Sequence, residues 1–230
     1  MSVEALFDDN LPTKMGAVAQ RFDREYRGQH PELPEEVQEM PIFQEWVTGT
    51  LAAKVASPFW EIAAPKKNQR CLDLGCGVGF LVYPWREWDA FFYGQEISTV
   101  AKDALNARAP QLNSKLFKGV KASPAHLIEY EELKFDLAIA TGFSCYFEVD
   151  YWRRVLDAVK KSLKPDGFFV FDVLDPDAPL AEDWAILETY LGAEALVQPL
   201  SDWKAAIRAE GGNIVKEKSG ELFHLYKVKF

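Results

Sequence analysis

The segment Arg70–Phe80, RCLDLGCGVGF, constrains the fold of this chain more than any other stretch. Its first part, Cys71–Leu74, is a short and mostly apolar run of the kind that forms a buried strand. Glycines then occupy alternate positions, Gly75, Gly77 and Gly79, where the backbone can turn sharply and approach a ligand closely. A helix that follows the loop would direct the free N–H groups of its first turn toward a ligand bound at the loop. Strand, glycine loop and helix predict the first unit of a nucleotide-binding α/β fold.

Strands and helices alternate along the rest of the chain. The predicted strands cover residues 71–74, 90–98, 116–120, 135–141, 167–174, 213–218 and 221–230. Helices are predicted between them, over residues 80–88, 99–109, 149–163, 180–191 and 201–210. The alternation predicts an α/β fold with a doubly wound, mostly parallel seven-stranded sheet. Ser219-Gly220 joins the last two strands, so they are expected to form an antiparallel terminal hairpin.

The first 60 residues precede the first strand and differ from the rest. Residues 1–12 carry no clear pattern and are interpreted as a tail. Apolar spacing predicts helices over residues 13–27 and 41–56, with Thr13 as the cap of the first. We expect these helices to form a lid over the carboxyl edge of the sheet. The whole chain, 1–230, is interpreted as a single domain, with a tail and helical lid in 1–60 and a Rossmann-like core in 61–230.

Charge and cysteine content narrow the possible functions. The 26 basic and 35 acidic residues give a net charge of −9, which disfavours nucleic acid as a partner because phosphate backbones are bound by many Lys and Arg side chains. Three irregularly spaced cysteines are too few for a disulfide framework or a four-ligand zinc site, and no metal site is predicted. The N-terminus lacks a signal sequence, and no apolar run reaches the ~20 residues of a membrane helix. These features predict a cytoplasmic protein that acts on a small molecule, and leave its oligomeric state open.

Several motifs occur in a familiar order. CLDLGCGVG is followed by Glu96 at the end of the next strand, then by FDLAIAT, LKPDGFFVF and the terminal hairpin. In this order and spacing, residues 60–230 resemble the class I S-adenosylmethionine-dependent methyltransferases. The resemblance implies a methyltransferase with S-adenosylmethionine as its cofactor.

The resemblance also assigns cofactor-binding residues. Gly75, Cys76, Gly77 and Gly79 would pass under the methionine and ribose portions. Asp73 would accept hydrogen bonds from the ammonium group, or it holds only the N–H groups of the loop itself. Glu96, 17 positions after Gly79, would accept from the ribose hydroxyls, the alternative being a surface acid at a strand end. The remaining residues assigned to the cofactor are Tyr26, Ile97, Val120, Lys121, Ala122, Thr141 and Gly142.

One part of the family pattern is missing. Many members carry an acid after the third strand that contacts the adenine amino group, whereas this chain reads KGVKASPAHL. Val120–Ala122 are therefore expected to hold adenine through a backbone carbonyl and apolar contacts.

Methyl transfer from a sulfonium needs a base only where the acceptor must lose a proton. Asp172, near the carboxyl end of the fifth strand, is the preferred candidate, and Tyr146 is the second. Asp175, His126 and His224 are further candidates by position, although both histidines are interpreted as structural. Phe143 and Phe147 are expected either to wall the site or to pack the core.

Two other functions stay open at this point. A nicotinamide-dependent oxidoreductase also uses a glycine loop and a distal acid, but its G-x-G-x-x-G pattern needs glycine where this chain has Phe80. A non-catalytic protein that keeps the fold to bind S-adenosylmethionine or S-adenosylhomocysteine, or to interact with a partner, is compatible with the missing adenine acid. The acceptor atom, whether O, N, C or S, is left open by the sequence.

Overall fold

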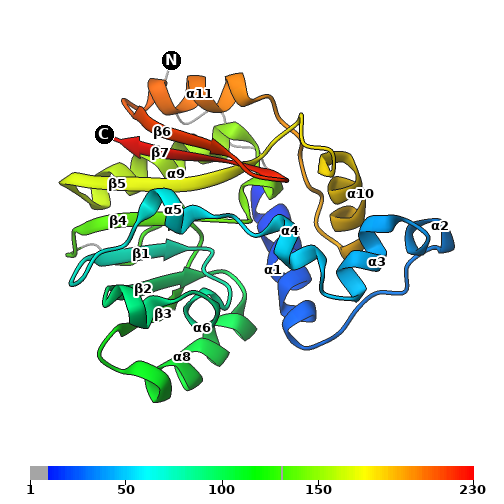
Figure 1. Cartoon of the computed structure of the whole chain (residues 1–230), viewed down its shortest axis with the longest axis horizontal. Helices are drawn as coiled ribbons and strands as arrows, with labels where there is room; N and C mark the ends of the chain where they lie inside the picture. Colours follow the sequence, from blue (N-terminus) through cyan, green and yellow to red (C-terminus); the bar gives the residue numbers. More distant parts are fainter. Residues whose placement is uncertain (1–9, 131) are drawn as a thin grey trace.

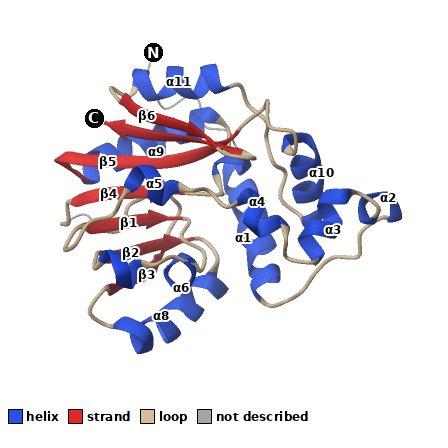
Figure 2. Cartoon of the chain, in the orientation of Figure 1, coloured by secondary structure: helices blue, strands red, loops and turns tan. Residues whose placement is uncertain are grey.

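The computed structural model describes residues 10–130 and 132–230, so most of the expected tail lies outside the described residues. Seven strands in the described ranges form one sheet in the order β3-β2-β1-β4-β5-β7-β6 (Figure 2). They are β1 (Arg70–Leu74), β2 (Phe91–Glu96), β3 (Phe117–Ala122), β4 (Phe135–Ala140), β5 (Leu163–Leu174), β6 (Asn213–Ser219) and β7 (Phe223–Lys229). The first five run parallel, whereas β7 is antiparallel to both β5 and β6. The predicted sheet and its terminal hairpin are confirmed.

Helices cover both faces of this sheet, as a doubly wound fold requires. On one face, Trp152 of α9 (Val149–Ser162) and Trp203 of α11 (Leu200–Ala209) pack with Phe171 of β5. On the other face, α5 (Phe59–Ala63), α6 (Gly79–Val82), α7 (Trp85–Trp88) and α8 (Thr99–Asn113) bury a second cluster. Successive strand residues point to opposite faces, so neighbours on β5 such as Val170 and Phe171 belong to different cores.

The remaining helices gather beyond one end of the sheet. Figure 1 shows α1 (Leu11–Tyr26), α3 (Pro41–Val47), α4 (Leu51–Val55) and α10 (Ala181–Leu191) beside one another, with α2 (Glu35–Gln38) at the outer edge. The N-terminal part of the chain therefore faces the carboxyl ends of the parallel strands, where α/β folds bind their ligands. None of the described helices is long and apolar enough to span a membrane.

The N-terminal helices differ from their predicted bounds. α1 begins at Leu11 rather than Thr13, because Pro12 fits the first turn, where a missing N–H removes no helical hydrogen bond. The single helix predicted over residues 41–56 is wrong. Gly49 takes a φ of +76° there, which divides the segment into α3 and α4.

Later elements also differ: the helix predicted over residues 80–88 is divided into α6 and α7, and β5 begins at Leu163 rather than at residue 167. Pro110 was expected to end its helix, but α8 continues to Asn113 and forgoes one backbone hydrogen bond at the proline. β3 extends two residues past its predicted end, to Ala122. Because β3 ends later than predicted, the residues that follow it at the carboxyl edge of the sheet begin at Ser123.

Candidate functional site

The glycine loop adopts the backbone that its sequence predicts. Gly75 and Gly77 have φ values of +62° and +47°, in the left-handed region that favours glycine. A Cβ atom would lie 2.6 Å from Phe143 Cδ1 at Gly75, and 2.6 Å from the Tyr26 hydroxyl oxygen at Gly77. The N–H groups of Gly75 and Cys76 donate to the Gln95 carbonyl, which ties the loop to β2. Glycine at these two positions therefore allows the Phe143 ring and the Tyr26 hydroxyl to lie against the loop backbone.

A Gly75→Ala substitution is expected to destabilise the protein by at least about 1–2 kcal/mol, the penalty for a left-handed alanine. The clash with the Phe143 ring adds to this penalty. Urea denaturation measures the change in the free energy of unfolding. Gly16→Ala is the matched control, because nothing lies within 4 Å of its added Cβ and alanine favours the α1 helix. Equal stability changes in the two variants would contradict the loop geometry.

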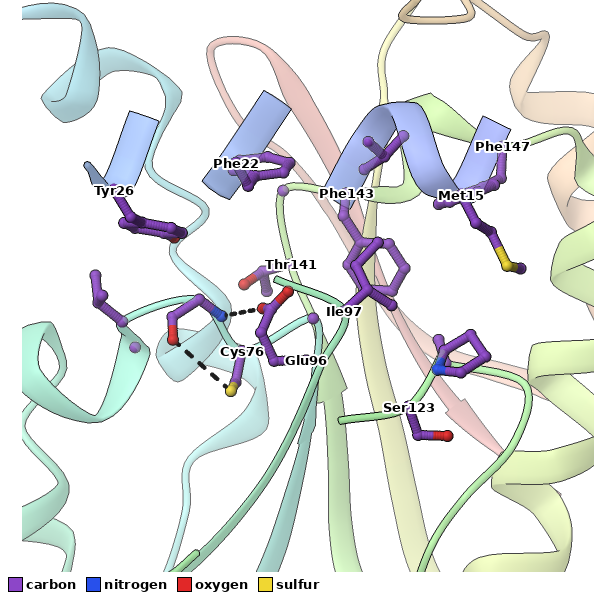
Figure 3. A pocket seen from close by; sticks show the side chains of 18 of the residues that line it. Met15, Phe22, Tyr26, Cys76, Glu96, Ile97, Ser123, Thr141, Phe143 and Phe147 are labelled. Atoms are coloured by element: carbon purple, nitrogen blue, oxygen red, sulfur yellow. Dashed lines mark hydrogen bonds between the residues drawn. The ribbon is translucent and has the colours of Figure 1, made fainter. Parts of the chain in front are cut away.

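Glu96, at the end of β2, is buried beside this loop. Its Oε2 accepts a hydrogen bond from Gly77 N at 2.7 Å (Figure 3). Its Oε1 accepts a hydrogen bond from Ser98 N at 2.8 Å. Burial raises the pKa of this carboxyl and outweighs the N–H donors, which favour the ionised form. Glu96 is therefore a fixed hydrogen-bond acceptor at the base of a cavity rather than a surface acid.

Asp73 lies below the loop and is almost inaccessible to solvent. A Cβ atom at Gly79 would lie 3.1 Å from Asp73 Oδ2, so the carboxylate lies directly under the third glycine. Burial, and then the negative charge of Glu96, raise the pKa of Asp73 well above its ordinary value. Asp73 is not among the residues that line the cavity.

A cavity of about 270 Å³ lies above Glu96 and the glycine loop. Figure 3 shows side chains of α1 above it, with Thr141 beside Glu96 near the centre and Ser123 at the lower right. Nine of the residues assigned to the cofactor line this cavity: Tyr26, Gly75, Cys76, Gly77, Gly79, Glu96, Ile97, Thr141 and Gly142. Phe143 and Phe147 line it as well. Residues from five separate parts of the chain thus meet at one cavity.

The α1 helix forms the roof of this cavity. Met15, Val18, Phe22 and Tyr26 recur every three or four residues, which places them on one helical face toward the cavity. Asp23 fixes the helix to the start of α8 by accepting from Ser98 Oγ at 2.7 Å and from Val100 N at 3.2 Å. The predicted apolar stripe of the first helix therefore faces the cavity.

A buried ion pair holds the same helix from its other side. Arg21 donates from Nε to Glu188 Oε2 at 2.7 Å and from a terminal nitrogen to Glu188 Oε1 at 2.8 Å, joining α1 to α10. The Tyr146 hydroxyl also donates to Glu188 Oε2, at 2.8 Å. Burial raises the pKa of Tyr146 well above its ordinary value. Tyr146 therefore lies behind α1 in this network, outside the cavity lining, and its placement does not favour a catalytic role.

Asp172 is also outside the cavity lining, although it lies close to it. Its Oδ1 accepts from Gly142 N at 2.8 Å, and its Oδ2 accepts from the hydroxyl of Ser57. The side chain is fully buried, and burial raises its pKa to about 7 despite these two donors. Asp172 can act on a bound molecule only through one of these partners.

The residues predicted to contact adenine, Val120–Ala122, do not line the cavity. Val120 makes both of its backbone hydrogen bonds to the Asn106 side chain, at 2.9 Å each, whereas Lys121 and Ala122 are exposed. None of the three lines the cavity; Ser123, Pro124 and Ala125 line it instead. The two-residue extension of β3 accounts for this shift.

The histidine candidates lie outside the cavity lining too. His126 Nδ1 is 3.4 Å from the Tyr151 hydroxyl, and burial, with the nearby Arg154 charge, lowers its pKa to about 4. His224 lies in the terminal hairpin, where its ring nitrogens contact Ser219 and Glu217. Asp175 is near His224, at 3.8 Å. Sequence reasoning did not assign Tyr83 and Tyr151, which line the cavity from loop and helix positions without a motif.

The comparisons with known proteins agree with this geometry. Residues 72–169 match the family Methyltransf_12, described as "Methyltransferase domain". No curated protein sequence matches the chain. The family match covers the glycine loop, Glu96, the strands β2 to β4, and parts of β1 and β5.

Solved structures share the fold across almost the whole chain. Geranyl diphosphate C-methyltransferase from Streptomyces coelicolor A3(2), crystallised with geranyl diphosphate and S-adenosyl-L-homocysteine, has a TM-score of 0.66 and 12% identity over 94% of this chain and 97% of its own. Magnesium protoporphyrin IX methyltransferase from Synechocystis PCC 6803, with bound S-adenosylhomocysteine, has a TM-score of 0.60 and 13% identity over 94% and 98%. The CcbJ methyltransferase from Streptomyces caelestis has a TM-score of 0.60 and 16% identity over 94% and 97%. At these identities the likeness establishes the fold, and with the domain match it confirms the resemblance that the motifs predict.

Proposed function

We propose that this chain, whose residues 72–169 form a methyltransferase domain on the class I fold, transfers the methyl group of S-adenosylmethionine to a small molecule. The observation that carries the proposal is the cavity between α1 and the glycine loop. The cavity combines a glycine-rich loop backbone, the buried Glu96 carboxylate and the apolar side chains of α1 in one site. The relatives crystallised with S-adenosylmethionine or S-adenosylhomocysteine share this fold.

The residues present fit this cofactor. Gly75 and Gly77 carry no Cβ atoms, so the loop backbone itself borders the cavity and a ligand could lie against it. Glu96 would accept hydrogen bonds from the ribose hydroxyls, for which each of its oxygens keeps a lone pair after accepting one N–H. Ser123–Ala125 would hold adenine in place of the predicted Val120–Ala122. Asp73 would act on the ammonium group from below the loop, through water or the loop itself.

When bound, S-adenosylmethionine supplies an electrophilic methyl group on a sulfonium. The chain's contribution is to position the reacting groups in line and to exclude water. Phe22 and Tyr26 would close the site from above, and Thr141 with Gly142 would border the side where the acceptor enters. Residues 10–60 would thus serve as the lid, and residues 61–230 as the core of a single domain.

A small acceptor is favoured over a macromolecule by two observations. The chain carries a net charge of −9, which opposes approach to a phosphate backbone. The α1, α3 and α10 helices cover the carboxyl end of the sheet and limit the space in front of it. Two of the structural relatives are named for small acceptors, geranyl diphosphate and magnesium protoporphyrin IX.

A Glu96→Ala substitution is expected to weaken binding of S-adenosylmethionine by about 1–3 kcal/mol, roughly 5- to 150-fold in Kd, because charge-assisted hydrogen bonds are lost. Isothermal titration calorimetry measures the change. Glu87→Ala, at an exposed position on α7, is the control and should leave the Kd unchanged. An unchanged Kd in a folded Glu96→Ala protein would remove Glu96 from the site.

The same titrations separate the alternatives. Binding of NAD without binding of S-adenosylmethionine would favour an oxidoreductase and overturn the proposal. Binding of S-adenosylmethionine with no S-adenosylhomocysteine formed across a broad set of small acceptors would favour the non-catalytic binding protein.

A further inference from the structure

A second, smaller cavity adjoins the proposed cofactor site. Its volume is about 150 Å³, and it shares Tyr83, Thr141 and Gly142 with the larger cavity. An apolar cavity of about this volume is known to hold one benzene ring. Thr141 and Gly142 follow the carboxyl end of β4, the side on which a methyl group would leave the cofactor, and Tyr83 follows α6.

The walls of this second cavity are mostly apolar. Val55 of α4, Trp184 of α10 and Phe223 of β7 line it, and the last two are buried. Lys, Arg, Asp and Glu side chains are absent from its lining among the described residues. The cavity therefore suits a neutral ring rather than a carboxylate or a phosphate.

Ser57 connects this cavity to a buried carboxylate, whereas the other two hydroxyl groups in the lining belong to Tyr83 and Thr141. Ser57, in the segment between α4 and α5, lines the cavity and donates its hydroxyl proton to Asp172 Oδ2. The second Asp172 oxygen is occupied by Gly142 N at 2.8 Å. The Ser57 oxygen can accept a further hydrogen bond, which makes it the route from the cavity to the buried carboxylate.

We infer that this cavity holds the reacting end of the acceptor, that the acceptor is a small phenol, and that Ser57 and Asp172 take up its proton. The inference rests on the proposed function and gives that site its substrate class. Ser57 contacts the acceptor, and Asp172 acts through Ser57. Trp184 and Phe223 contact the ring.

The proposed methyl transfer conserves atoms, electrons and charge. The phenol oxygen forms a bond to the methyl carbon as the carbon–sulfur bond breaks, and the electron pair of that bond stays on sulfur. The phenol proton passes to Ser57 Oγ, and the Ser57 proton passes to Asp172 Oδ2. The sulfonium charge and the carboxylate charge disappear together, and the products are a methyl phenyl ether, S-adenosylhomocysteine and a protonated Asp172.

The acidity of the groups agrees with this assignment. Burial raises the pKa of Asp172 to about 7, which is close enough to that of a phenol, near 10, for proton transfer in the transition state. Tyr83 and Cys145 are the titratable groups that interact with Asp172, and burial raises the pKa of both, to about 12 for Tyr83. The neighbours from the other elements, Ser57 and Gly142, carry no charge. Turnover should therefore rise as the pH passes about 7, following Asp172 alone.

The test uses the full chain and three probes: phenol, 4-methylphenol and 2-methoxyphenol. Each is titrated into protein saturated with S-adenosylhomocysteine, and its methyl ether is then measured by mass spectrometry after incubation with S-adenosylmethionine. We expect at least one probe to bind and to be methylated. Ser57→Ala should lower kcat by roughly 10- to 100-fold with an unchanged Kd for S-adenosylhomocysteine. Ser57→Thr, which keeps the hydroxyl, should restore turnover, and Asp172→Asn should abolish the pH dependence.

The outcomes that overturn the inference are distinct. If S-adenosylhomocysteine binds but none of the three phenols binds, the acceptor class is wrong and the proposed function stands. If a phenol is methylated equally well by the protein and by Ser57→Ala, the proton route is wrong. Failure of S-adenosylhomocysteine itself to bind would overturn the proposed function first, and the inference with it.

Discussion

Replacing Arg21 by methionine is expected to lower the free energy of unfolding by about 3–5 kcal/mol. The substitution leaves Glu188, which is 1% exposed, as a buried carboxylate without its cationic partner. The Tyr146 hydroxyl that donates to Glu188 replaces only part of the lost interaction. Urea denaturation at neutral pH measures the effect.

Two further variants identify the cause. Arg21→Met combined with Glu188→Gln removes the charge but keeps an acceptor for Tyr146, and should recover most of the lost stability. Arg27→Met removes a half-exposed ion pair to Asp23 on the same helix, 3.9 Å long, and should change stability by less than about 1 kcal/mol. Similar losses in the Arg21 and Arg27 variants would show that the buried pair does not hold α1 to α10.

Replacing Asp172 by asparagine is expected to change how stability depends on pH, by up to about 4 kcal/mol between acid and neutral conditions. Burial raises the pKa of Asp172 in the folded protein to about 7, above its ordinary value of 3.8. The folded state therefore binds this proton more tightly than the unfolded state does. The resulting stability is complete below about pH 4 and is lost as the pH rises to about 7. An asparagine side chain does not titrate, so the variant should gain stability relative to the natural protein over that range.

Unfolding curves in urea at about pH 5, 6 and 8 test this prediction. Asp89→Asn is a control of opposite sign, because hydrogen bonding to Lys67 lowers the pKa of that exposed carboxyl. Its removal should reduce stability above the ordinary pKa of aspartate rather than raise it. A constant difference between the Asp172 variant and the natural protein at all three pH values would contradict a raised pKa at Asp172.

The sequence predicts the core of this fold well because its signals are local. An apolar run before the alternate glycines identifies β1 and its loop, and Ser219-Gly220 identifies the terminal hairpin. Glu96 is recognisable in the sequence because it is an acidic residue at the end of the strand that follows the loop. In the structure this position places the Glu96 carboxylate beside Gly77. These features depend on residues that are close together in the chain.

The rest of the site depends on contacts between distant segments. Ser57 meets Asp172 across 115 positions, and Arg21 meets Glu188 across 167 positions, without any local pattern in either pair. Tyr146 follows β4, as many site residues do, yet its hydroxyl points to Glu188 because α10 packs behind it. Val120–Ala122 fall outside the cavity lining for a smaller reason: the end of β3 lies two residues later than its sequence suggests.

A crystal structure of the protein with S-adenosylhomocysteine tests the central claim most directly. We expect the ribose hydroxyls within hydrogen-bond distance of the Glu96 carboxylate, adenine beside Ser123–Ala125, and the sulfur facing Thr141 under the α1 helix. S-adenosylhomocysteine bound away from Glu96 and the glycine loop, or a cavity that takes up NAD in its place, would contradict the account.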